Sequence, residues 1–211
     1  MNWPGIIMAA AGVLAPGYSQ LEFPAPVAGT YELPRLWAAA DGNILRSDGA
    51  ATRLHEQLGD KAVILSFIYT SCGDVNGCPL ATFVLSRLQG PIQDDPGLRD
   101  RVRLVTLSFD PQHDTPAVMR RYGQSFRQDG FDWRFLTTES TQALAPLLDS
   151  YDQSILREDG DSGTVISHVL RVYLIDTDKQ VRNIYNTSFL HQETILSDLR
   201  TVLKPRDDWR N

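Results

Sequence analysis

Cysteine is scarce in this chain, and long runs of charge or of hydrophobic residues are absent. Two cysteines in 211 residues exclude a disulfide scaffold, because such scaffolds are short and dense in cysteine. Acidic residues outnumber basic ones, 26 against 20, and neither sign forms a long run, which argues against nucleic acid as a partner. The 42% of hydrophobic residues nevertheless suffices for one well-buried core.

The N-terminal segment is apolar and rich in small residues from Trp3 to Tyr18, between Pro4 and Pro16. It is shorter than the roughly 20 residues that span a bilayer, so we expect no transmembrane helix there. We interpret it as a degenerate signal peptide that lacks the usual basic start, with a loosely packed extension as the alternative. If the segment is a signal peptide, the protein is exported, and we expect it in a bacterial periplasm.

The sequence predicts three parts along the chain. Residues 1–29 form the signal segment and an extended lead-in, residues 30–205 one domain, and residues 206–211 a C-terminal tail.

Alternating strand and helix patterns organise the predicted domain. The segment 62–69 is a continuous apolar run, which is typical of a strand buried on both faces of a parallel sheet, and 102–109 is predicted to be a second buried strand. Apolar residues at helical spacing predict helices over 79–88 and 116–126. The remaining predictions are a strand at 133–136, helices at 139–151 and 192–203, and a Gly/Asp-rich turn around 157–163.

Two hairpins complete the predicted fold. Strands at 168–176 and 181–185 flank a turn, and strands at 31–37 and 43–46 flank the turn at Asp41-Gly42. Right-handed crossovers with an antiparallel hairpin give a mixed sheet with helices on both faces. The expected fold class is therefore α/β and thioredoxin-like, with an added N-terminal β-hairpin.

The two cysteines lie in the loop that follows the first buried strand. Open α/β sheets place their ligands at this edge, beyond the carboxyl ends of the strands. Cys78 precedes the next helix, where backbone N–H groups favour a thiolate, so we expect its pKa to be lowered. Gly73 and Gly77 allow the loop to bring Cys72 close to Cys78, either as a disulfide or as two ligands of one metal ion.

Histidine supplies the remaining candidate ligand. We expect His168 to begin the strand beside the first one, near the cysteine loop, whereas His55 and His191 are predicted at the surface and His113 in an exposed loop. Two thiolates and one imidazole form a set that suits Cu(I), with a further oxygen or solvent for Cu(II). Structural zinc would take a fourth protein ligand. A plain stabilising disulfide remains the alternative, although so short a loop gains little from closure.

Motifs spread along the chain carry a family resemblance. They are Tyr69-Thr70 before the first cysteine, Asp74-Val75 between the cysteines, Cys78-Pro79, Asp110-Pro111, Asp114-Thr115-Pro116, and His168 ahead of Tyr173-Leu174-Ile175-Asp176. In these motifs the sequence resembles the Sco/SenC/PrrC family of thioredoxin-like proteins that bind copper and assist cytochrome oxidase assembly. The resemblance implies that Cys72, Cys78 and His168 are copper ligands.

One departure concerns the cysteine loop. Relatives usually separate the two cysteines by three residues, whereas five residues, 73–77, separate them here. Loop geometry sets the sulfur separation, so the change affects copper affinity and reduction potential. Asp110 and Asp114 also match family positions, and we expect structural roles for both, at a strand end and a helix start.

Two functions remain open. The first is a copper metallochaperone that passes its ion to a client cuproprotein such as a cytochrome oxidase subunit, with no catalytic turnover. The alternative is a thiol–disulfide oxidoreductase, in which Cys72 and Cys78 form the redox-active pair and His168 tunes the thiolate. A peroxide-reducing enzyme is disfavoured because the sequence features of such enzymes precede neither cysteine.

Overall fold

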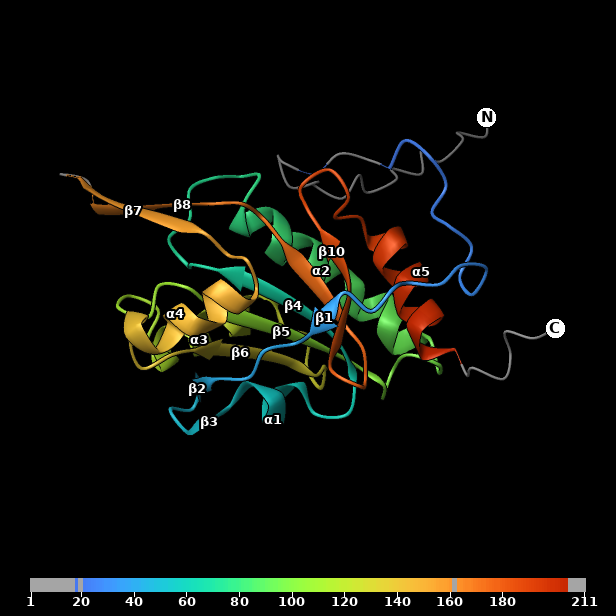
Figure 1. The fold of residues 1–211 in the computed structure, drawn as a ribbon, viewed down its shortest axis with the longest axis horizontal. Helices are drawn as coiled ribbons and strands as arrows, with labels where there is room; N and C mark the ends of the chain where they lie inside the picture. Colours follow the sequence, from blue (N-terminus) through green and yellow to red (C-terminus); the bar gives the residue numbers. More distant parts are fainter. Residues whose placement is uncertain (1–17, 19–20, 161–162, 205–211) are drawn as a thin grey trace, which may run out of the picture.

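The computed structural model describes residues 18, 21–160 and 163–204. Their main sheet has eight strands in the order β1-β10-β9-β4-β5-β6-β2-β3, and a separate two-stranded ribbon is formed by β7 and β8 (Figure 1). The strands are β1 (Trp37–Ala38), β2 (Asn43–Arg46), β3 (Ala51–Arg53), β4 (Ala62–Ile68), β5 (Val102–Ser108), β6 (Trp133–Thr137), β7 (Ile155–Gly160), β8 (Gly163–His168), β9 (Val172–Ile175) and β10 (Gln180–Tyr185). The helices are α1 (Leu54–Leu58), α2 (Cys78–Asp94), α3 (Pro116–Phe126), α4 (Thr141–Ser150) and α5 (Gln192–Leu203).

The centre of the sheet is parallel and its flanks are antiparallel. β4 and β5 pair in parallel over their full lengths, β6 continues in parallel, and β9 and β2 join antiparallel. Every residue of β4 and β5 is buried, as expected for strands covered on both faces. The apolar runs in the sequence therefore mark the middle of the core.

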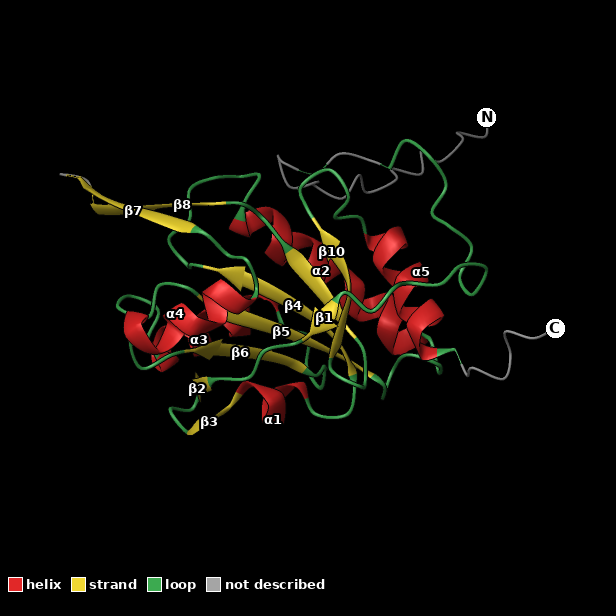
Figure 2. Cartoon of the chain, in the orientation of Figure 1, coloured by secondary structure: helices red, strands yellow, loops and turns green. Residues whose placement is uncertain are grey.

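Helices cover both faces of this sheet, as Figure 2 shows. α2 and α3 lie together on one face, where the Thr82 and Tyr122 hydroxyls are 2.7 Å apart, and α5 packs beside α2. On the other face, the α1 carbonyls of Gln57 and Leu58 accept hydrogen bonds from Arg103 of β5. Tyr151, at the end of α4, stacks against Phe67 on that same face. The thioredoxin-like arrangement expected from the element order is confirmed.

The predicted N-terminal hairpin is wrong. β1 and β2 do not pair: β1 joins β10 at one end of the sheet, and β2 lies at the other end between β6 and β3. The hairpin that forms is β2–β3, closed by the turn at Gly49, whose φ of 89° suits a residue without a Cβ atom. The sequence favoured Asp41-Gly42 as the turn of a hairpin, but β1 and β2 pair with strands at opposite ends of the sheet instead of with each other.

The segment around 157–163 also differs from its prediction as a turn. It belongs to a β-ribbon in which β7 and β8 pair from Ile155↔His168 to Gly160↔Gly163. In Figure 1 this ribbon projects away from the body of the molecule. His168 consequently ends β8 and does not begin the strand β9, which starts at Val172.

The described chain ends near α5 and contains no membrane-spanning candidate. The backbone N–H of Gly29 bonds to Thr201, and the Pro26 carbonyl accepts from Ser197, so the lead-in runs along α5. None of the helices in the described ranges is long and apolar enough to cross a bilayer. The predicted signal segment, apart from Tyr18, and the predicted tail 206–211 lie outside the described residues.

Candidate metal centre

The cysteine loop connects the end of β4 to the start of α2. Its turn is closed by a 3.0 Å hydrogen bond from the Gly77 N–H to the Asp74 carbonyl, and the Asp74 carboxylate accepts from the Asn76 N–H. A Cβ atom at Gly77 would lie 3.3 Å from the Asp74 carbonyl oxygen and 3.5 Å from the Cys72 sulfur. Glycine at position 77 therefore allows the turn to close tightly on Asp74, whereas the Cys72 sulfur would be at an ordinary contact distance.

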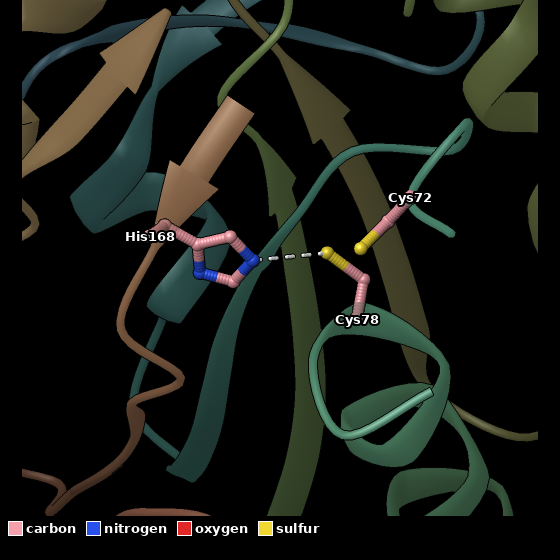
Figure 3. A group of neighbouring side chains, drawn as sticks. All are labelled: Cys72, Cys78 and His168. Carbon is pink, nitrogen blue, oxygen red and sulfur yellow. Dashed lines mark hydrogen bonds between the residues drawn. The ribbon is translucent and has the colours of Figure 1, made fainter. Parts of the chain in front are cut away.

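Three side chains converge at this edge of the sheet. Cys72 comes from the loop, Cys78 from the first turn of α2, and His168 from the end of β8 (Figure 3). The Cys78 sulfur is 3.4 Å from His168 Nε2, and the ligand atoms of all three residues lie within 4.8 Å of one another. The predicted site residues are thus brought together from segments 90 positions apart.

Aromatic rings and a backbone amide surround the convergence. The His168 ring centroid lies 4.7 Å from that of Phe109 and 6.2 Å from that of Tyr69, and the Tyr69 N–H points at the Cys78 sulfur at 3.4 Å. The His168 Nδ1 atom is buried and has no partner among the described residues. Packing rather than a second hydrogen bond holds this imidazole in place.

Asp114 fixes the start of the cysteine loop. Its buried carboxylate accepts hydrogen bonds from the N–H and hydroxyl of Thr70 and from the Ser108 hydroxyl at the end of β5. Asp110 is also buried, bonded to His113 and to Arg157. Both aspartates have structural roles, as expected. Asp114 holds the start of the cysteine loop, and Asp110 pairs with Arg157 of the β7–β8 ribbon.

The two thiols differ strongly in acidity. The pKa of Cys72 is held well below its ordinary value by hydrogen bonding to the Cys78 side chain and then to His168, against the effect of burial. Burial, followed by the neighbouring Cys72 thiolate, raises the pKa of Cys78. The expectation that the helix start lowers the pKa of Cys78 is wrong, because this residue is only 1% exposed and desolvation outweighs the helix dipole.

Tyr69 belongs to a family motif in the sequence but was given no role at the site, and the structure shows that it contacts Cys78 and His168. Burial, then the Cys72 and Cys78 thiols, raise the pKa of this phenol to about 12. Its position just before Thr70-Ser71-Cys72 was the available signal.

The other three histidines lie outside the convergence. His113 is exposed, as expected, with Nδ1 2.8 Å from Asp110. His55 is half-buried, with Nε2 2.8 Å from the Ala39 carbonyl oxygen. The surface position predicted for His191 is wrong, since this residue is 4% exposed beneath the ring of Tyr18. Among the described residues, only Cys72, Cys78 and His168 form a His/Cys/Asp/Glu group with metal-binding geometry.

The donor set itself indicates which metals fit. Two sulfurs and one imidazole nitrogen are soft and borderline ligands, which favour Cu(I) over oxygen-seeking cations such as Mg²⁺ or Ca²⁺. Both cysteines are free thiols in this structure, so both sulfurs are available as ligands.

Fold and site together define a class: thioredoxin-like proteins with a paired-cysteine and histidine group at the sheet edge. The family model SCO1/SenC matches residues 44–204, and the chain belongs to the SCO1/SenC family.

Sequence comparison finds relatives in bacteria and mammals. The chain is 24% identical over 149 residues to the SCO1 protein homolog of Bacillus subtilis, covering 70% of this chain and 74% of that protein. It is 30% identical over 127 residues to the mitochondrial SCO2 homolog of Bos taurus, covering 59% of this chain and 45% of that protein. The chain thus spans about half the length of its mammalian relatives.

Solved structures resemble the whole described domain. Bradyrhizobium japonicum ScoI with copper bound matches with a TM-score of 0.64 at 25% identity, covering 79% of this chain and 99% of that one. A SCO1/SenC family lipoprotein from Bacillus anthracis matches with a TM-score of 0.67 at 24% identity, covering 80% and 96%. These matches confirm the thioredoxin-like fold.

Proposed function

We propose that this protein is a copper metallochaperone in which Cys72, Cys78 and His168 bind the ion. The observation that carries the proposal is the convergence of two thiols and one imidazole within 4.8 Å at the edge of the sheet. Two thiolates and an imidazole form a three-coordinate set suited to Cu(I), and a solvent or oxygen ligand would complete a Cu(II) site. Copper-bound ScoI structures from Bradyrhizobium japonicum and Arabidopsis thaliana support this choice of metal.

The unequal exposure of the ligands suits transfer rather than permanent storage. Cys78 is buried, whereas Cys72 is partly exposed and would be the first ligand that an incoming donor group replaces. His168 lacks a partner for Nδ1 among the described residues, so no second hydrogen bond opposes its departure. Release by stepwise ligand exchange requires no catalytic turnover.

The client we propose is an exported cuproprotein, such as a subunit of cytochrome c oxidase. A solved relative is described as a member of the Sco family of cytochrome c oxidase assembly proteins. Export to the periplasm is supported by the apolar N-terminal segment of the sequence and by the lipoprotein relative from Bacillus anthracis.

Competitive titration tests the proposed site. The reduced protein is titrated with Cu(I) against a chromophoric chelator, alongside His168→Ala and the double change Cys72→Ser/Cys78→Ser. We expect one tight equivalent and none in the double variant. His168→Ala should lose at least as much affinity as the roughly 10- to 100-fold that is typical of residues that only orient a ligand. His55→Ala, which removes an imidazole of α1 outside the site, serves as the matched control. Tight binding that survives in the double variant would contradict the proposal.

A thiol–disulfide oxidoreductase is the second candidate. The observation in its favour is the acidic, partly exposed Cys72 thiol beside the buried Cys78 thiol, a pairing suited to attack followed by resolution. Reduction of a small disulfide at a rate comparable to that of thioredoxin-type enzymes, with no tight Cu(I) binding, would favour this function over copper transfer.

A further inference from the structure

The ribbon β7–β8 carries His168 but is attached to the body at few places. Cross-strand pairs place Ile155 opposite His168 and Arg157 opposite Ile166, so these four side chains share one face of the ribbon. Ile166 on this face is 3% exposed, whereas Leu156 on the opposite face is 69% exposed. The face that bears His168 is therefore the one that lies on the body of the protein.

Arg157 makes the polar connection on that face. One guanidinium nitrogen lies 3.0 Å from the Asp110 carboxylate, and the other donates to the Phe109 carbonyl at 2.8 Å. The Asp110 side chain is 3% exposed, and His113 shares its other oxygen. Arg157 therefore binds the buried carboxylate through one nitrogen and the neighbouring backbone carbonyl through the other. This contact is a rigid anchor, because separating the ions would leave Asp110 in a poorly solvating environment.

The segment that Arg157 binds, Phe109 and Asp110, contacts both His168 and the support of the cysteine loop. Phe109, whose carbonyl Arg157 binds, follows the last residue of β5, and its ring meets the His168 ring edge to face. The Asp110 N–H is held by Ser108, whose hydroxyl in turn bonds to Asp114 and so connects to the start of the cysteine loop. The Arg157 contact therefore links the ribbon to the same short segment that supports the cysteines.

We propose that Arg157 is a positioning residue for His168: its two bonds fix the ribbon so that the imidazole faces the Cys78 sulfur. This inference rests on the proposed copper function and adds a residue outside the ligand set. Side chains two residues apart on one face of a strand are separated by roughly 7 Å, so Arg157 anchors the ribbon two cross-strand pairs away from His168, at the next pair on the same face. A lysine would keep the charge but not both directed bonds.

Copper affinity in a double-mutant cycle tests whether Arg157 acts through His168. We expect Arg157→Gln to weaken Cu(I) binding by about 10- to 100-fold, in the range typical of residues that orient a metal ligand. Combining it with His168→Ala should add little further loss, because the ligand being positioned is already gone. Arg157→Lys should restore only part of the affinity. Arg171→Gln, which removes an ion pair with exposed Asp152 beside the ribbon, is the matched control and should bind as the unaltered protein does.

A second measurement examines the metal-free protein. In Arg157→Gln, amide exchange should quicken across the ribbon, residues 155–168, but not in β4 or β5, and the NMR signal of the His168 ring should shift. Unchanged copper affinity, or an equal loss with and without His168, would overturn the proposal. If the unaltered protein bound no copper, the proposed function would fail, and the exchange and NMR results would still decide whether Arg157 anchors the ribbon and its imidazole.

Discussion

Cys72 and Cys78 have opposite environments although both belong to one loop and helix start. Cys72 is partly exposed and receives hydrogen bonds that stabilise its thiolate, whereas Cys78 is enclosed and keeps its proton more firmly. In the metal-free protein the pair therefore consists of one accessible nucleophile and one buried thiol. The reactive sulfur is the loop cysteine and not the one at the helix start.

This difference predicts selective alkylation. With iodoacetamide, Cys72 should react first and should keep most of its rate at pH 6, because a lowered pKa leaves the thiolate populated below the range in which ordinary thiols lose it. Cys78→Ala removes the leading cause of the shift, so the rate of Cys72 should then fall as pH decreases from 8 to 6. Mass spectrometry of the labelled peptides measures both. Labelling of Cys78 before Cys72 would be inconsistent with this assignment.

At the scale of elements, α3 packs on β6 unusually closely. A Cβ atom at Gly123 of α3 would lie 2.5 Å from the Phe135 ring of β6, and Gly123 is buried. The glycine therefore allows the helix to approach the strand, and the Tyr122 ring packs against the same phenylalanine.

A pair of glycine substitutions tests this packing. Gly123→Ala should reduce the free energy of unfolding by about 1–3 kcal/mol, since the added methyl displaces Phe135 or the helix. Gly90→Ala, in the interior of α2, should change stability by less than about 1 kcal/mol, because the gain in helix propensity is opposed by contact of the new methyl with the ring of Pro91. Urea denaturation monitors both variants. Equal effects of the two changes would show that propensity, not contact, controls the α3 position.

Elements buried on both faces could be predicted from the sequence, and elements that depend on distant partners could not. The apolar runs of β4 and β5 and the spacing of apolar residues in α2 and α5 leave little choice of structure. β1 has only two residues and exists because β10 pairs with it, which no local pattern encodes. Glycine and aspartate around residue 160 suggested only a turn, so the ribbon β7–β8, and with it Arg157, was missed.

Across the whole molecule, the candidate site exists only when the chain is folded. The sequence placed Cys72 and Cys78 together through a short loop. It added His168, 90 residues from Cys78, through the expected neighbouring strand and then through the family resemblance. The sequence could not show how deeply Cys78 is buried, and this burial makes Cys72 rather than Cys78 the more acidic thiol. It could not give the links through Asp110 and Asp114 either, because those depend on how neighbouring strand ends meet.

A site assembled by folding predicts that metal binding stabilises the protein. Free Cu(I) at about 100 times the dissociation constant should raise the free energy of unfolding by about 2.7 kcal/mol, less any affinity of the unfolded chain for the metal. Chemical denaturation under reducing conditions, with and without Cu(I), measures the gain. Cys72→Ser/Cys78→Ser should show none, and a gain of equal size in that variant would place the ion elsewhere.

The outermost strands of the main sheet are β1 and β3, of two and three residues. An open sheet presents unpaired N–H and C=O groups along its borders, which invites association with other chains. Borders this short offer too few consecutive groups for another strand to add in register. The fold can thus present its two cysteines and His168 at the ends of its strands while its outermost strands give other chains few groups to pair with.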